Sequence, residues 1–336
     1  MQQKTSPDNQ KNMEMYIDYT IHENKITVIS CKGYGDSISL PSHIKGIPVT
    51  RVGAYAFSDI DKSRECIPLE SRIFTERIPG IIIPGWEAEY IFGRKLKEIS
   101  LPKDLEVIDE YAFYDCRELA AIHMWSGRIQ LENGVFMNCE KLMEVYVNGN
   151  AEEVTCVSGI LSEISEEVCI NFSSDGERGV FIFPEFYEDS IENTPARVFH
   201  YLIYGAGYRY RQCFEQGRLN ILAYDTVFQS AEIQNIQETA LKIAFARIQY
   251  PYQLHETIRN KYINYITLHM DAAVDLMLST DNLEGIVFLT ELGVMTENNY
   301  TAALSKAVNT GKKECASILL KEKLHYYPPA EKTFEL

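Results

Sequence analysis

Residues 96–148 repeat without a gap every 23 residues, and this period restricts the possible folds more than any other feature of the chain. Similar apolar side chains recur in the same columns: Leu96, Leu119 and Leu142; Ile99, Ile122 and Val145; Leu101, Met124 and Val147; Phe113 and Phe136; Cys116 and Cys139. One such coil cannot bury its own apolar edge, whereas stacked coils share a continuous core. The period therefore predicts a solenoid.

Within one unit the spacing predicts a short strand followed by a tight coil. Ile99-x-Leu101 alternates with period two, and Pro102 ends the strand. Ala112-Phe113 suits a coil on the opposite side of the unit. In the next unit, His123 stands between two core columns, so we expect its side chain to face away from the core. His123 and the nearby Trp125 are therefore candidate partner-binding residues.

The same pattern extends in both directions, with insertions. Ile38-Ser39-Leu40-Pro41 matches the strand at Ile99, and Ile81–Pro84 is interpreted as a further rung. Residues 16–30 alternate around Glu23-Asn24 and predict a hairpin that caps the stack. Val168 and Ile170 stand 23 residues after Val145 and Val147, which predicts a last rung.

The repeat unit Leu-x-x-Ile-x-Leu-Pro…Leu-x-x-Ile…Ala-Phe-x-x-Cys resembles BspA-type bacterial leucine-rich repeats. The run from Tyr19 through Ile44-Lys45-Gly46-Ile47-Pro48 to Ala56-Phe57 is similar to the opening of that family's domain. The resemblance covers about residues 16–150. It implies a right-handed solenoid whose β face contacts proteins or ligands and does not carry out catalysis. Well-known members of the family are secreted or attached to the cell surface.

Residues 176–235 leave the 23-residue pattern. Val180–Pro184 predicts a buried strand, and Thr194-Pro195 predicts a helix start, with the helix running to about Tyr204. In Gly205–Arg211, two arginines alternate with tyrosines. One interpretation is an anionic partner held by Arg209 and Arg211, with Tyr208 stacking on it. The other is a turn whose arginines pair with nearby carboxylates: Glu185, Glu188 and Asp189.

From residue 236 onward the apolar period becomes helical. A gapless 30-residue repeat aligns Ala272-Ala273 with Ala302-Ala303, Thr280 with Thr310, and Phe288-Leu289 with Ile318-Leu319. Each unit predicts a helix, a turn and a second helix. The arrangement is similar to a degenerate ankyrin repeat, which implies another stacked binding surface. An ordinary helical bundle that only caps the solenoid is the alternative.

The fold class that we predict is α+β, a leucine-rich-repeat solenoid followed by a helical, ankyrin-like stack. The segments are a disordered arm (1–12), the repeat domain (13–175), a mixed connecting segment (176–235), the helical repeat domain (236–326) and a tail (327–336).

Composition narrows the classes of partner. The formal net charge is −16, which disfavours nucleic acid and anionic membranes. No apolar run is long enough for a membrane helix, and residues 1–12 lack the apolar core of a signal peptide. Eight cysteines without a Cys-x-x-Cys pair suit reduced thiols. We therefore expect a cytoplasmic protein, or an extracellular one if a signal has been removed.

The sequence contains no motif that supports catalysis. Its seven histidines and eight cysteines show no metal-ligand spacing, and no Gly-x-Ser-x-Gly elbow occurs. We therefore expect no cofactor and no metal. The hypothesis is a non-catalytic interaction or scaffold protein whose partner is another protein. The alternatives are a surface or secreted adhesin, and an enzyme with a site near 205–211.

Overall fold

The structure is a computed structural model that describes residues 13–60, 62–82, 87–193, 198–230, 233 and 236–328, with the backbone alone for 188–193 and 198–204. The predicted arm (1–12) and most of the predicted tail lie outside these ranges. The chain divides into two compact units between Tyr224 and Asp225. This boundary falls inside helix α3 (Ile221–Val227), within the predicted connecting segment.

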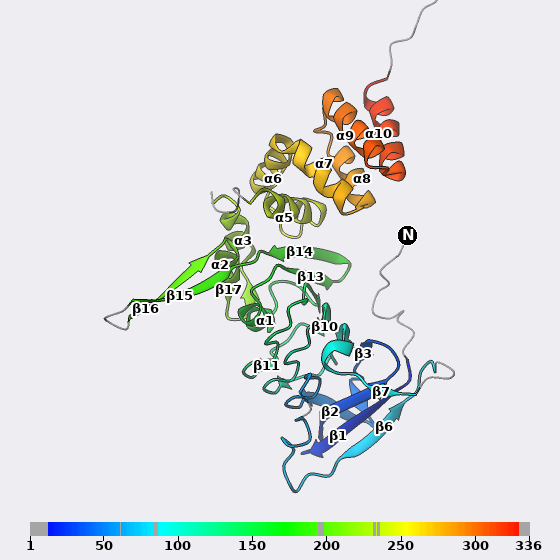
Figure 1. Cartoon of the computed structure of the whole chain (residues 1–336), viewed down its shortest axis with the longest axis vertical. Helices are drawn as coiled ribbons and strands as arrows, with labels where there is room; N and C mark the ends of the chain where they lie inside the picture. Colours follow the sequence, from blue (N-terminus) through cyan, green and yellow to red (C-terminus); the bar gives the residue numbers. More distant parts are fainter. Residues whose placement is uncertain are drawn as a thin grey trace, which may run out of the picture. The chain divides into compact units, whose positions relative to one another are not determined.

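One sheet of the first unit stacks the predicted strand columns (Figure 1). Its strands, in spatial order, are β14 (Glu177–Phe183), β13 (Val168–Ser174), β12 (Glu144–Asn148), β10 (Ala121–Trp125), β8 (Glu98–Ser100) and β3 (Ser37–Ser39). All neighbours are parallel except β13 and β14. The column Ile99, Ile122, Val145 and Ile170 stands in direct register and is fully buried. The solenoid prediction is confirmed.

The other core columns are equally regular. Leu96, Leu119 and Leu142 are each 0% exposed. On the coil side the rings of Phe57, Phe113 and Phe136 form a ladder, with centroids 5.3 and 5.2 Å apart and planes within 6° of parallel. These separations are close to the ~4.8 Å spacing of neighbouring strands, so each repeat places its ring on the ring of the preceding one.

A second sheet completes the first unit. It contains β1 (Met15–His22), β2 (Lys25–Gly33), β4 (His43–Ile44), β5 (Ile47–Val52), β6 (Phe74–Ile78), β7 (Glu89–Tyr90), β9 (Val107–Ile108) and β11 (Gln130–Leu131). The predicted hairpin is confirmed as β1 and β2, with Glu23 and Asn24 at φ 47° and 57° in its turn. Because β2 pairs with β5, the hairpin closes the N-terminal end of this sheet.

The predicted rung at Ile81–Pro84 is wrong. β3 pairs directly with β8, and Ile38 stands opposite Ile99, so no strand lies between them. Ile81 forms only a bridge to Met13 and is 41% exposed, as Ile82 is 49% exposed. Residues 83 and 84 lie outside the described ranges. The insertion therefore leaves the stack, and the 3-10 helix η2 (Gly93–Lys95) brings the chain back to β8.

The C-terminal end of the solenoid departs partly from expectation. The predicted last rung is β13, and the predicted strand at Val180 is β14. The predicted helix through Phe199 to Tyr204 is wrong, because these residues form strand β16 (Val198–Tyr204), paired with β15 (Tyr187–Asn193). The proposed helix start at Thr194-Pro195 lies outside the described residues. In the described part of the chain, β15 and β16 pair only with each other.

Short elements close the solenoid after β12. They are α1 (Val157–Glu163), α2 (Gly207–Arg211) and the hairpin of β17 (Phe214–Glu215) and β18 (Arg218–Leu219). The hydroxyl of Tyr224 accepts from the N–H of Ile182 at 2.9 Å and donates to its carbonyl at 2.7 Å. Tyr224 also packs on Phe181 and Phe183 of the same strand. It therefore covers the edge of β14.

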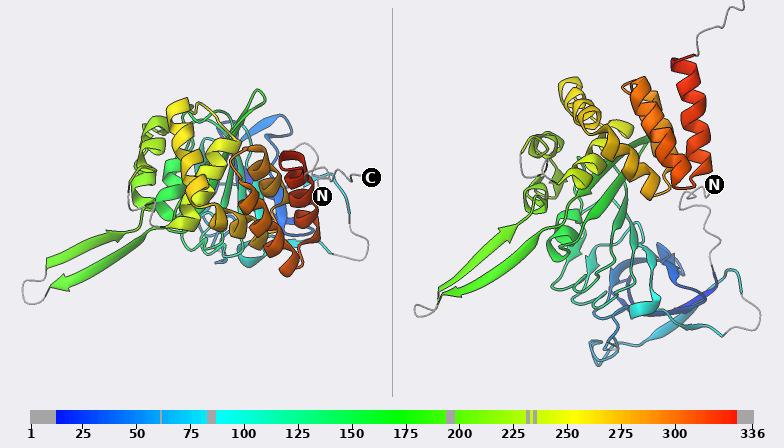
Figure 2. Two further views of the ribbon diagram at one scale, coloured as in Figure 1. Left: turned by 90° about the horizontal axis from the view of Figure 1, so that it is seen from above. Right: turned by 45° about the horizontal axis from the view of Figure 1, so that its top comes forward.

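The second unit consists of helices (Figure 2). They are α5 (Gln237–Gln249), α6 (Glu256–Leu268), α7 (Met270–Ser279), α8 (Leu283–Glu291), α9 (Glu297–Asn309) and α10 (Lys313–Tyr326). The 30-residue repeat corresponds to the pairs α7–α8 and α9–α10. Thr280 and Thr310 each donate a side-chain hydrogen bond of 2.8 Å to the carbonyl four residues earlier. The predicted helix pairs are confirmed, and the ankyrin resemblance stays a prediction.

Candidate protein-binding surface

The solenoid presents an outward face, formed by alternate residues of the parallel strands and covered at its β13 end, where Asn171 is 7% exposed and accepts from Arg178. Strand register aligns its residues in rows: Ser37, Glu98, Ala121, Glu144 and Cys169; Ser39, Ser100, His123, Tyr146 and Asn171; Trp125, Asn148 and Ser173. Because the alternate residues fill the core, this face is fixed by the same period that builds the solenoid. It carries carboxylates and aromatic rings side by side.

His123 lies at the centre of this face, and its predicted outward orientation is confirmed. Its neighbours Ile122 and Met124 are 0% and 2% exposed. Its imidazole stacks on Tyr146, with centroids 4.5 Å apart, and its Nε2 lies 2.7 Å from Oε1 of Glu98. The ring is thus held by a neighbour on each side, which leaves a fixed, partly exposed aromatic surface.

Trp125 continues the aromatic surface at the end of β10. Its side chain is 37% exposed, and the ammonium group of Lys103 lies 5.2 Å from its ring centroid. An exposed tryptophan beside polar groups is a frequent anchor in protein interfaces. His123 and Trp125 are therefore brought onto one surface, as the sequence pattern predicts.

The second predicted group, Tyr208, Arg209 and Arg211, lies in α2 rather than in an open turn. Gly207 begins the helix where a Cβ would lie 2.0 Å from the carbonyl oxygen of Pro184, so only glycine allows this close approach. Tyr208 is 38% exposed and lies near Phe186, with centroids 6.4 Å apart. A partner-binding role for Tyr208 and Arg209 stays a prediction.

Arg211 faces inward. Its guanidinium donates to five backbone carbonyls, those of Leu161, Ile164, Glu166, Pro184 and Gly207, and it stacks over Phe186 at 4.5 Å. Burial lowers its pKa from 12.5 to about 10, so it stays charged at neutral pH. Its bonding partners are therefore carbonyls rather than the predicted carboxylates or an external anion. This arginine ties α1, and Pro184 directly after β14, to α2.

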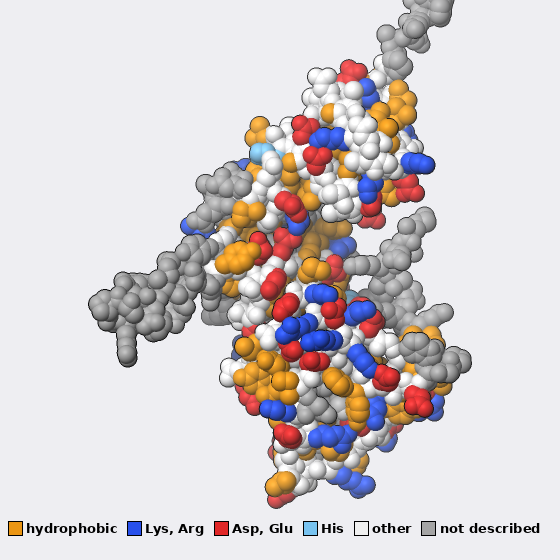
Figure 3. Space-filling model, in the orientation of Figure 1, with side chains coloured by type: hydrophobic (Ala, Val, Ile, Leu, Met, Phe, Trp, Pro, Cys, Tyr) orange, Lys and Arg blue, Asp and Glu red, His pale blue; other side chains and the backbone are white. Residues whose placement is uncertain are grey.

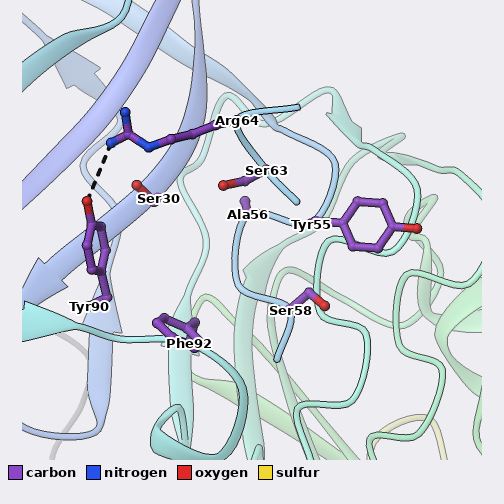
Figure 4. Close-up of a pocket in the computed structure, with 8 residues that line it drawn as sticks. All are labelled: Ser30, Tyr55, Ala56, Ser58, Ser63, Arg64, Tyr90 and Phe92. Carbon is purple, nitrogen blue, oxygen red and sulfur yellow. Dashed lines mark hydrogen bonds between the residues drawn. The ribbon is translucent and has the colours of Figure 1, made fainter. Parts of the chain in front are cut away.

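A small cavity lies behind the N-terminal hairpin (Figure 4). Its volume is about 30 Å³, and Ser30, Tyr55, Arg64 and Tyr90 are among its lining residues. Arg64 donates to Asp18 at 2.7 Å and to the hydroxyl of Tyr90 at 3.4 Å. Because one water molecule needs roughly 10–15 Å³ of cavity volume, the cavity suits one or two water molecules rather than a substrate.

Charges on the solenoid are interspersed. On the face that Figure 3 presents, basic and acidic side chains alternate over the first unit. Arg51 with Asp109 and Lys141 with Glu118 join neighbouring coils, and Lys25 of the hairpin pairs with Glu106. Among the described residues, no group of three or more His, Cys, Asp or Glu side chains is placed to hold a metal ion. In the same ranges, no helix has the length and hydropathy of a membrane span.

Comparison with protein families identifies the repeat. Residues 88–158 match the family described as BspA type leucine rich repeat region (6 copies). This segment belongs to the BspA-type leucine-rich-repeat family. A solved leucine-rich-repeat protein of T. pallidum is similar over 38% of this chain and 67% of that chain, with 18% identity and a TM-score of 0.21. No curated protein matches the chain.

The BspA-type segment contains β8, β10 and β12, which form the centre of the outward face. Sequence reasoning selected His123 and Trp125 but missed Glu98, Tyr146 and Lys103. Tyr146 stands 23 residues after His123, so the period itself places it in the next rung. Lys103 lies in a loop, where no period predicts its approach to Trp125.

Proposed function

We propose that this chain is a non-catalytic interaction or scaffold protein that binds another protein through the outward face of its parallel sheet. The observation that carries the proposal is the fixed strip formed by His123, Tyr146 and Trp125, with Glu98 bonded to it. Membership of residues 88–158 in a leucine-rich-repeat family supports it. Solenoids bind through extended surfaces whose shape is set by stacking.

Affinity capture from native lysate tests this proposal. Wild-type chain is compared with Trp125→Ala and with Met137→Ala, a matched control at a 48% exposed residue in a coil outside the sheet. We expect quantitative mass spectrometry to find proteins retained by the wild type and the control and depleted with Trp125→Ala. Equal recovery by all three proteins would contradict the use of this face.

Arg209→Ala distinguishes the second predicted surface in the same experiment. Arg209 is a better choice than Arg211, because removing Arg211 would leave five backbone carbonyls without their donor. Loss of captured protein with Arg209→Ala alone would move the binding site to α2.

We propose the cytoplasm as the working compartment. The support is that none of the eight cysteines is in a disulfide, and that Cys31, Cys116, Cys139 and Cys156 are buried in the core. Cell fractionation with detection of the native protein tests this proposal. Recovery outside the cell would instead favour the adhesin hypothesis.

A further inference from the structure

Strand β3 leaves one edge of the parallel sheet open. It pairs with β8 on one side, and no described strand pairs with its other side. In this register Asp36 accepts from β8 and Leu40 donates to it, so the main-chain groups of Ile38 also face β8. The N–H and C=O groups of Ser37 and Ser39 therefore face the open edge. Such an edge is a template for another strand.

A groove runs along this edge. Its volume is about 230 Å³, and it is lined by Met13, Glu14, Met15, Ile91 and the segment 33–39. Apolar side chains form much of its lining, and Ile38 and Ile91 are each only 3% exposed. At Gly35 a Cβ would meet nothing within 4 Å, which shows open space. The β1–β2 hairpin pairs with β5 in the other sheet and does not pair with β3, so the main-chain edge of β3 is open although the apolar side chains beneath it are buried.

The charged lining of the groove is acidic. Glu14 and Asp36 are the charged residues among those that line it. Glu14 is bonded by Arg77, whereas Asp36 remains 48% exposed although Lys97 lies 2.9 Å away. Together with the net charge of −16, this favours an occupant that carries lysine or arginine. The open row of main-chain groups favours an extended segment over a helix, because only an extended segment can continue the ladder.

We propose that an extended segment of a partner protein binds at β3 by adding a strand beside Ser37–Ser39, with an apolar side chain in the groove and a basic side chain near Asp36. This proposal goes beyond the proposed function, which uses the outward face of the strands rather than their edge. Residues 1–12 of this chain are a poor fit as the occupant, since they are polar apart from Met1 and Pro7.

A labelled synthetic peptide, acetyl-Lys-Ile-Ser-Ile-Ser-Lys-amide, tests the proposal by fluorescence polarisation with the full chain. We expect saturable binding in the millimolar range or tighter. A matched peptide that is N-methylated at every residue cannot donate to the edge from either side, and we expect it to bind at least about tenfold more weakly. No binding of the first peptide, or equal binding of both, would overturn the proposal.

The matched protein variants are Ser37→Pro and Ser37→Ala. Proline removes the N–H that faces the groove without removing a bond to β8, a position at which edge strands accept it. We expect Ser37→Pro to lose binding and Ser37→Ala to retain it. If Ser37→Pro fails to fold, amide exchange of Ser37 and Ser39 in the wild type replaces it, and we expect the peptide to slow this exchange.

Analytical ultracentrifugation tests whether a second copy of this chain, instead of a partner protein, occupies the edge. A wild-type dimer that Ser37→Pro dissociates would mean that a second copy of the chain fills the edge, which overturns the partner proposal. Trp125→Ala leaves the β3 edge intact, so we expect it to bind the peptide normally. Loss of peptide binding would therefore contradict only the edge proposal, and equal capture with Trp125→Ala would contradict only the proposed use of the outward face.

Discussion

At the scale of single residues, the second unit depends on one buried ion pair. Arg247 is 0% exposed, and its Nε and Nη2 donate to the two carboxylate oxygens of Asp225 at 2.8 and 2.9 Å. Tyr262 adds a bond of 2.8 Å to the same carboxylate. Asp225 is the carboxylate that balances the charge of this guanidinium, so its removal would leave a charge in the core.

We expect Asp225→Ala to lower the free energy of unfolding of the second unit by about 3–5 kcal/mol, because it leaves Arg247 buried without its counter-charge. Urea denaturation measures the loss. The matched control is Asp275→Ala, which removes an exposed pair with Lys306 and should change stability by less than about 1 kcal/mol. Equal effects of the two variants would contradict the buried-pair account.

The cysteines of the solenoid make a second prediction at this scale. Burial raises the pKa of Cys139 and of Cys156 from 9.0 to about 12. An unfolded thiol therefore ionises first, and stability that is complete below pH 9 is lost as the pH rises from 9 towards 12. Within this window each thiol contributes a slope of about −1.4 kcal/mol per pH unit.

Urea midpoints between pH 6 and 11 test the cysteine prediction. We expect the double variant Cys139→Ala, Cys156→Ala to lose stability less steeply than the wild type above pH 9. Below pH 8 the two slopes should agree, which serves as the internal control. Parallel curves over the whole range would show that these thiols do not set the alkaline limit.

At the scale of elements, the coils depend on a left-handed position that recurs in each repeat. Tyr55 and Tyr111 have φ of 56° and 57°, and Gly134 has φ of 66° at the position 23 residues after Tyr111. The rings of Tyr55 and Tyr111 stack at 5.3 Å. A Cβ on Gly134 would lie 2.5 Å from the ring of Tyr111, so glycine is needed there for space as well as for backbone conformation.

We expect Gly134→Ala to destabilise the first unit more than Gly46→Ala. Gly46 has φ of 80° and open space around its Cβ position. Its alanine variant therefore measures the cost of the left-handed backbone conformation alone, about 1–2 kcal/mol of unfolding free energy. The clash with Tyr111 should add about 1–3 kcal/mol. In a Tyr111→Ala background this addition should disappear, and its persistence in thermal unfolding would refute the steric account.

At the scale of the whole molecule, each unit contains its own core. The first is built from stacked columns such as Ile99 and Ile122, and the second from helices around Arg247. We expect calorimetry to resolve two transitions. Gly134→Ala should lower the midpoint of one and Asp225→Ala that of the other. A single transition shifted by both variants would show that the units unfold together.

The solenoid, its core columns, the N-terminal hairpin and the C-terminal helix pairs could all be read from the residues alone. These features follow from local periods, because the spacing of the apolar residues decides which side of each strand or helix faces the core. It also placed His123 outward, since that requires only the alternation of a strand.

Features that depend on contacts between distant segments could not be read from the residues and emerge from the folded chain. The apolar run at Ile81 looks like a rung, but β3 and β8 pair directly across the insertion. The residues after Phe199 form a strand because backbone pairing with β15 outweighs a local helix signal. The inward turn of Arg211, the contact of Glu98 with His123 and the open edge of β3 likewise depend on long-range contacts, which no spacing along the chain encodes.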